Sequence, residues 1–262
     1  MKRVGRPGPP PEAKRTIKID IQYQGTNYVG WQRQAKGKSV QGLVEGALSK
    51  IANEKITLFS ASRTDAGVHA LQQVASFSLQ KSKTPSQAFV EGTNTLLPED
   101  IRILQAEEMD LHFFAPEAKE KTYRYFIQTG AIPLVFIRAY AWHIPSRFNH
   151  PLRLSAMDEG SRQLLGTYDF SAFRSGAATT QTSVRTVLNV KWGEGPLGLI
   201  YFEVTAEGFL KYMVRNIVGT LVEVGQGKRK PEDVRLILES KQRSKAGPTA
   251  PPNGLFLWSV TY

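Results

Sequence analysis

The residues best suited to chemistry lie in one short polar stretch, Ser60–Ala70, which reads Ser-Ala-Ser-Arg-Thr-Asp-Ala-Gly-Val-His-Ala. Asp65 is its only carboxylate, with Arg63 two residues before it and His69 four residues after it. A carboxylate can act as a nucleophile or as a general base, and a loop at the rim of a sheet lets a substrate reach it. The same residues suit an ordinary turn, since Asp hydrogen-bonds its own backbone and Gly accepts a positive φ. The local pattern leaves both interpretations open.

Two strand-like segments flank this stretch. Lys55–Phe59 is rich in residues that favour strands, and alternate residues over 74–79 are Ala, Phe and Leu. We therefore expect residues 60–70 to form a loop between two strands.

The rest of the first half completes the element order βαββαβ. Apolar residues alternate over 16–23 and predict a half-buried strand, while Ser39 is a suitable N-cap for a helix over 40–51. A second helix over 85–96 and a strand over 101–107 follow. This order is that of a ferredoxin-like fold, in which an antiparallel sheet carries helices on one face.

The second half is expected to repeat this topology without repeating the sequence. Strands are predicted over 121–128, 139–144, 183–192, 199–205 and 254–262, and helices over 154–165, 209–224 and 231–238. The predicted domains are a flexible basic Pro/Gly-rich tail over 1–13, an N-terminal α+β domain over 14–115 that carries the Asp65 loop, and a C-terminal α+β domain over 116–262. The fold class is thus α+β, with two ferredoxin-like halves and a basic cleft between them.

Composition narrows the class of partner and the compartment. The net charge of +11 favours a polyanion, because each Lys or Arg that neutralises a phosphate releases a counterion, although a solvated basic surface is the alternative. Cysteine is absent, so disulfides and thiolate metal ligands are excluded. No stretch approaches the ~20 apolar residues of a membrane span. We expect a cytoplasmic protein.

Three residues outside the polar stretch can contribute to binding or chemistry. Trp31, in a long loop over 25–38, can stack on RNA or anchor its own loop. Tyr123, on a predicted strand, can pack on a base and exchange a proton through water, or can be a core aromatic. Arg215 lies in a strongly apolar helix, where a buried cation needs a carboxylate partner, and Asp65 is the candidate. Alternatively, Arg215 faces solvent beside Lys211.

Four segments together resemble one known family. Arg63–Ala70 (Arg-Thr-Asp-Ala-Gly-Val-His-Ala) resembles the catalytic motif of the tRNA pseudouridine synthases of the TruA type. Lys121–Tyr125, Phe209–Leu221 and Ala246–Leu255 resemble three further motifs of that family. Those enzymes usually carry Gly where this chain has Ser62.

The resemblance implies a role for each candidate residue. It assigns Asp65 as the nucleophile, and Tyr123 as the residue that stacks on the target uracil and takes part in proton transfer. Arg63 matches the arginine associated with extrusion of the base, although it can also be a surface residue that bonds its own loop. Arg215 joins the catalytic set. His69 is expected to order the loop or to meet phosphate as part of substrate binding, without acid–base work.

The resemblance also implies an enzyme without metal, nucleotide or other cofactor, usually a homodimer, that acts on uridines 38, 39 and 40 of the tRNA anticodon stem-loop. A non-catalytic RNA-binding protein with domains like RNA-recognition motifs is the alternative. The Asp65 loop argues against it, because a carboxylate in a basic cleft would repel phosphate. A zinc-dependent deaminase is disfavoured, since the chain has no Cys and no His-x-Glu pattern.

Overall fold

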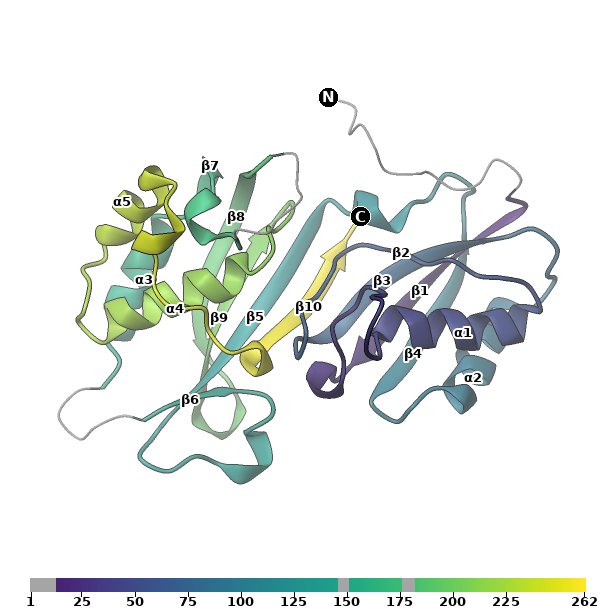
Figure 1. Cartoon of the computed structure of the whole chain (residues 1–262), viewed down its shortest axis with the longest axis horizontal. Coiled ribbons are helices and arrows are strands. Elements are labelled where there is room, and N and C mark those ends of the chain that lie inside the picture. Colours follow the sequence, from purple (N-terminus) through teal and green to yellow (C-terminus); the bar gives the residue numbers. More distant parts are fainter. Residues whose placement is uncertain (1–12, 146–150, 176–181) are drawn as a thin grey trace. The chain divides into compact units, whose positions relative to one another are not determined.

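The computed structural model describes residues 13–145, 151–175 and 182–262, which divide into two compact units (Figure 1). Among these residues, unit 1 comprises those up to Ala118 together with Tyr262, and unit 2 comprises Lys119–Thr261. The tail predicted over 1–13 lies outside the described residues except for Ala13. Within the described part of the chain, the helices are too short or too polar to cross a membrane.

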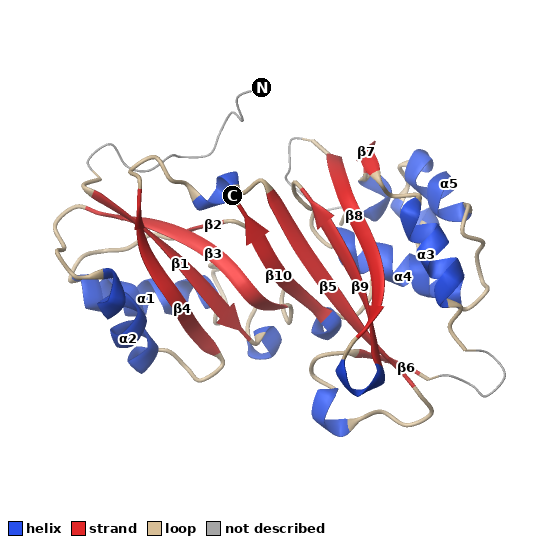
Figure 2. Cartoon of the chain, turned by 180° about the vertical axis from the view of Figure 1, so that it is seen from behind, coloured by secondary structure: helices blue, strands red, loops and turns tan. Residues whose placement is uncertain are grey.

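Unit 1 has the predicted βαββαβ order. Its elements are β1 (Arg15–Tyr23), α1 (Val40–Ala52), β2 (Phe59–Ser60), β3 (His69–Leu79), α2 (Ser86–Leu96) and β4 (Ile101–Met109). The strands run in the order β4-β1-β3-β2, every neighbouring pair is antiparallel, and both helices lie on one face of the sheet (Figure 2). Ser39 caps α1 as predicted, since its hydroxyl accepts a hydrogen bond from the Gly42 backbone at 3.3 Å.

The strand predicted over Lys55–Phe59 is wrong in its extent, because β2 covers only Phe59–Ser60. Side chains of α1 make the backbone hydrogen bonds at Leu58 that a neighbouring strand would otherwise have made. The Glu45 carboxylate accepts a hydrogen bond from the Leu58 N–H at 2.8 Å, and Gln41 Nε2 donates to the Leu58 carbonyl at 3.1 Å. The loop is also shorter than predicted, since β3 begins at His69.

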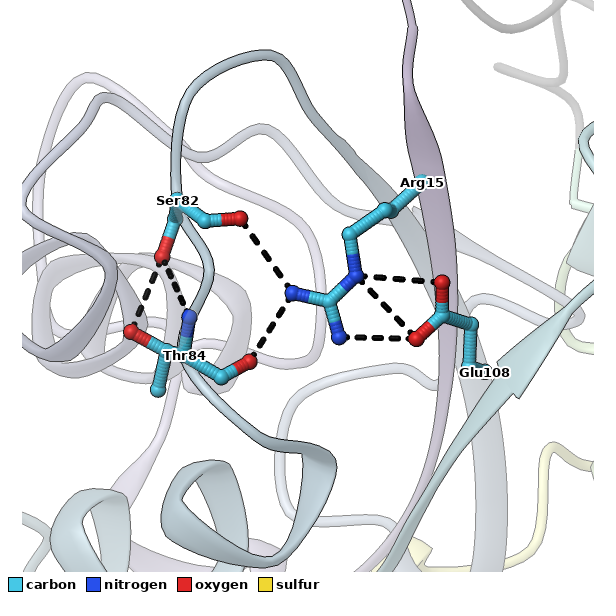
Figure 3. A network of polar contacts seen from close by, with 4 residues as sticks. All are labelled: Arg15, Ser82, Thr84 and Glu108. Atoms are coloured by element: carbon cyan, nitrogen blue, oxygen red, sulfur yellow. Dashed lines mark hydrogen bonds and ion pairs between the residues drawn. The ribbon is translucent and has the colours of Figure 1, made fainter.

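Arg15 ties three segments together at the start of β1 (Figure 3). Its Nη2 lies 2.7 Å from a carboxylate oxygen of Glu108 on β4, and its Nη1 donates to the carbonyls of Ser82 and Thr84 at 3.2 and 2.9 Å. The hydrogen bonds from Arg15 hold the pKa of Glu108 below its ordinary value. The connection between β3 and α2 is thereby fixed to the edge of the sheet.

Unit 2 repeats this topology with additions. Its elements are β5 (Glu120–Thr129), β6 (Trp142–Ile144), α3 (Leu154–Arg162), β7 (Gly166–Asp169), β8 (Val184–Glu194), β9 (Leu199–Ala206), α4 (Met213–Gly225), α5 (Asp233–Ser240) and β10 (Leu255–Thr261). The order β10-β5-β9-β8 corresponds to β4-β1-β3-β2 of unit 1, again with antiparallel neighbours. The additions are β7, which extends the sheet beyond β8, and β6, which is parallel to β5. The predicted pair of ferredoxin-like topologies is confirmed.

In unit 2 one strand was missed, and the bounds of several predicted elements need correction. β7 was not predicted, and the strand predicted over 139–144 is reduced to Trp142–Ile144. The helix predicted over 209–224 begins at Met213, because Tyr212 has a left-handed conformation (φ 66°) that cannot continue an α-helix. The helix predicted over 154–165 ends at Arg162.

Candidate active-site residues in each unit

Asp65 lies at the head of a tight turn in the loop between β2 and β3 of unit 1. Its carbonyl accepts a hydrogen bond from the Val68 N–H at 3.1 Å, and Gly67 has a φ of 78°. Asp65 is partly exposed and Arg63 is exposed. The turn and the chemical interpretation are therefore compatible, because the turn uses the backbone of Asp65 and leaves the residue partly exposed.

Residues of β1 and the following loop hold the backbone beside Asp65. The Trp31 N–H donates to the carbonyl of Thr64 at 3.1 Å, and the hydroxyls of Tyr23 and Thr64 are 2.7 Å apart. Trp31 is only 1% exposed and stacks on Tyr23 with 5.9 Å between ring centroids. Of the two roles that the sequence left open for Trp31, the structure thus supports the loop anchor.

The two loops approach so closely that only glycine fits at two positions. A Cβ at Gly25 would lie 2.0 Å from the carbonyl oxygen of Val68, and one at Gly30, which has a φ of 107°, would lie 2.7 Å from that of Thr64. Because the colliding atoms belong to the backbone, neither contact can be relieved by a side-chain rotation. These glycines allow the loop after β1 to support the Asp65 loop directly.

His69 is buried, with 1% of its surface exposed. Its Nδ1 lies 3.0 Å from the Gly25 backbone N–H, which donates to it, so this nitrogen carries no proton. A buried acceptor of this kind fits the loop-ordering alternative and offers little surface for a phosphate.

Ser62 stands where the family usually has Gly, and the structure accommodates this difference. Gln73, which is fully buried, donates to the Ser62 carbonyl at 2.8 Å, and the Ser62 N–H lies 3.3 Å from Gln73 Oε1. Both bonds use the backbone of Ser62, so exchange of Gly for Ser leaves the approach to Asp65 in place.

Tyr123 lies in β5 of unit 2 and is 4% exposed. Its ring packs edge-on against Phe209, with 5.0 Å between centroids. Tyr125, two residues along on the same face, is fully buried and donates its hydroxyl proton to the Pro251 carbonyl at 2.8 Å. Burial raises the pKa of Tyr125 well above its ordinary value, while the nearby Arg215 opposes that shift. Tyr125 therefore remains a hydrogen-bond donor.

Arg215 lies in the first turn of α4 and bonds to the segment before β10. Its Nε donates to the Ala250 carbonyl at 2.8 Å, and the Ala250 N–H donates to the Arg215 carbonyl at 3.1 Å. The guanidinium carbon is 4.7 Å from the centroid of the Tyr212 ring. Lys211 lies before α4 begins, so the two cations do not share one helix. Lys211 is exposed and Arg215 is partly exposed, so the alternative that Arg215 faces solvent beside Lys211 stays open.

The segment Ala246–Leu255 packs against α4, so two of the sequence motifs meet in unit 2. Gly247 donates its N–H to the Thr220 hydroxyl at 2.9 Å, and the Thr249 hydroxyl donates to Asn216 Oδ1 at 2.6 Å. A Cβ at Gly219 would lie 1.7 Å from the Pro248 carbonyl oxygen, so only glycine permits this approach.

Sequence reasoning missed Tyr212 as a candidate. A left-handed backbone in a bulky residue is strained, and such strain gathers at functional sites. Its aromatic ring also faces the guanidinium of Arg215. Nothing in the residue type signals a positive φ, because a Tyr residue rarely adopts one.

The predicted site residues are thus divided between the units. Asp65, Arg63 and His69 belong to unit 1, whereas Tyr123 and Arg215 belong to unit 2. The chemical roles of these residues, and the pairing of Arg215 with Asp65, stay predictions. Among the residues that the structure describes, no three or more His, Asp or Glu side chains gather as they would to hold a metal ion.

Comparison with known proteins adds a family match to this geometry. Residues 20–117 and 161–262 match a family model described as tRNA pseudouridine synthase. Proteins named tRNA pseudouridine synthase A from Acetivibrio thermocellus and Pelobacter propionicus are each 44% identical to this chain, over 249 and 250 residues. One from Geobacter sulfurreducens is 43% identical over 250 residues. Each comparison covers 95% of this chain and 100% of the relative.

Proposed function

This chain belongs to the tRNA pseudouridine synthase family, and we propose that it converts uridine to pseudouridine at positions 38, 39 and 40 of the tRNA anticodon stem-loop. The observation that carries the proposal is the Asp65 loop, in which Trp31 and Tyr23 hold Thr64 while the neighbouring residue Asp65 remains partly exposed. Because tRNA is the substrate, we also propose a cytoplasmic location.

The reaction exchanges one carbon–nitrogen bond for one carbon–carbon bond and moves one proton within the same nucleotide. The N1–C1′ glycosidic bond breaks, the base turns, C5 bonds to C1′, and the C5 proton is lost while N1 gains one. Asp65 is the proposed nucleophile or base that begins this sequence. Its carboxylate can attack C1′, add to C6 or take the C2′ proton, and all three routes use its ionised form.

The other candidates would prepare the base for this attack. Arg63, exposed two residues before Asp65, is proposed to fill the space that an extruded uridine leaves, since unstacking costs a few kcal/mol. Tyr123 is proposed to contact the uracil and to assist proton transfer. Arg215 is proposed to act in catalysis through its cationic guanidinium, which its bond to Ala250 orients. His69 is proposed to act on substrate binding by ordering the Asp65 loop.

The direct test incubates the pure protein with unmodified anticodon stem-loop RNA. We expect a uridine isomer of unchanged mass that retains a carbodiimide adduct after alkali. Tight binding without any isomer would instead favour the non-catalytic RNA-binding alternative.

We expect full activity in EDTA without added nucleotide or redox cofactor. The reaction is an isomerisation, so its atoms and electrons balance without a co-substrate. The measurement is the initial rate of isomer formation with and without EDTA, using RNA whose fold in EDTA is checked independently. Activity that EDTA removes and a divalent metal restores would contradict this expectation.

We also propose that two copies of the chain associate. An apolar segment between β5 and β6 supports this proposal, because Ile132, Val135 and Phe136 are 80%, 69% and 94% exposed. Large apolar side chains that cluster at a surface mark interaction sites. Two copies of a chain of net charge +11 repel each other, and contact between their apolar segments can offset this repulsion.

Sedimentation of the double variant Val135→Ser, Phe136→Ser tests this association. The parent should sediment as a dimer and the double variant as a monomer, because the substitutions remove the apolar contact area. Leu236→Ser, at a 61% exposed residue of α5, is the matched control and should remain dimeric. A monomeric parent, or a double variant that stays dimeric, would exclude this surface as the interface.

A further inference from the structure

The loop over residues 32–38 of unit 1 is the most continuously exposed basic element near Asp65. All seven residues are exposed, and three of them, Arg33, Lys36 and Lys38, are cations without an acidic residue between them. We propose that this loop, here called the basic loop, binds backbone phosphates of the tRNA beside the uridine on which Asp65 acts. The inference rests on the proposed function and adds a substrate-binding element to it.

The neck of the basic loop is fixed. The Val29 N–H donates to the Lys38 carbonyl at 3.0 Å, the Val40 N–H donates to the Gly30 carbonyl at 3.2 Å, and Gln34 Nε2 donates to the Val29 carbonyl at 2.9 Å. A neck closed by these bonds presents its cations from a preorganised frame, so little ordering entropy is lost when a ligand binds.

An ion pair between exposed Arg33 and buried Glu45 adds a second attachment. Glu45 of α1 is 5% exposed, and its Oε2 lies 3.1 Å from Nη1 of Arg33. Its Oε1 accepts hydrogen bonds from the Leu58 N–H at 2.8 Å and from Gln41 Nε2 at 3.0 Å. The Glu45 carboxylate is buried, so without Arg33 its charge would be left without a cation, and this cost favours the pair. Glu45 is therefore a positioning residue for the basic loop.

The basic loop is also close enough to Asp65 to share one substrate. Trp31, just before the loop, donates its N–H to Thr64, the neighbour of Asp65. Lys36 follows Trp31 by five positions, and an extended chain advances at most about 3.6 Å per residue, so the Lys36 backbone lies within roughly 18 Å of that bond. Phosphates close to the target nucleotide fall within this range. A solvated basic loop without a ligand is the alternative.

The first experiment uses the double variant Lys36→Gln, Lys38→Gln and the parent. It measures their affinity for unmodified anticodon stem-loop RNA as a function of salt concentration. Each lost phosphate contact should make the slope of log affinity against log salt shallower by about 0.7–0.9. The control is Lys50→Gln, Lys55→Gln, which removes the same charge from exposed residues of the same unit. The control should keep the slope, the affinity and the single-turnover rate of the parent.

The results separate this inference from the proposed function. If the basic-loop variant and the control have the same slope and affinity while the parent forms pseudouridine, the basic loop makes no phosphate contact and the inference is wrong. If the parent forms no pseudouridine, the proposed function fails, whatever the slopes show.

A double-mutant cycle tests the role of Glu45. Glu45→Gln keeps an acceptor for the Leu58 N–H but loses the charge that holds Arg33, and Arg33→Gln removes the other partner. Each variant should raise KM for RNA and leave kcat unchanged, and the double variant should be no weaker than the weaker single variant. Thermal melting verifies that all three fold. Additive losses of affinity, or a loss confined to kcat, would show that Glu45 does not act through Arg33.

Discussion

The Asp65→Asn variant is expected to form no pseudouridine while it binds tRNA within several-fold of the parent. The amide keeps the size and shape of the side chain but lacks the negative charge that a nucleophile or base needs. The turn should survive, because its hydrogen bond to Val68 uses the backbone carbonyl of residue 65. The measurements are single-turnover isomer formation with enzyme in excess and equilibrium binding of the same RNA.

A carboxylate elsewhere in unit 1 provides the matched control for this variant. Asp110 is exposed and accepts a hydrogen bond from the His112 N–H at 2.8 Å, so Asp110→Asn removes one charge from a comparable turn. It should retain the rate of the parent. Turnover by Asp65→Asn at the rate of Asp110→Asn would remove Asp65 from the mechanism.

The Tyr123→Phe variant is expected to lose about 10²–10⁴-fold in single-turnover rate, the usual contribution of a positioned proton-transfer group. The ring should keep its edge-on contact with Phe209, so folding and RNA binding should change little. The assay is the same single-turnover measurement, accompanied by RNA affinity and thermal melting.

Tyr201→Phe is the matched control for Tyr123→Phe. Tyr201 lies in β9 opposite Phe126, and its ring faces the side of the sheet that carries Arg124 rather than the side of Tyr123. The control should keep the rate of the parent. If Tyr123→Phe also keeps that rate, Tyr123 is the core aromatic that its 4% exposure equally suits, and the proton-transfer role is excluded.

The order of elements could be predicted because it depends on local periodicity. Alternation over 16–23 and helical spacing after Ser39 are properties of short segments, and the structure confirms both. The extent of β2 could not be predicted, since Leu58 gives its backbone hydrogen bonds to Glu45 and Gln41, thirteen and seventeen residues away. A partner from another element overrode the local preference for a strand.

The candidate site could likewise be predicted in part. Arg63–Ala70 could be identified from its residue types and its resemblance to a family motif. The contacts that support that loop could not be predicted, because Gly25 and Gly30 support it only through their close approach to Val68 and Thr64. The left-handed backbone of Tyr212 could not be predicted either, because a Tyr residue rarely adopts a positive φ.

The most direct test of the central claim maps pseudouridine at nucleotide resolution in unmodified tRNA treated with the parent protein or with Asp65→Asn. We predict isomer at positions 38, 39 and 40 with the parent wherever the tRNA carries uridine there, and none at these positions with the variant. Isomer confined to other positions, or equal isomer with both proteins, would contradict the proposed substrate site or the proposed nucleophile, respectively.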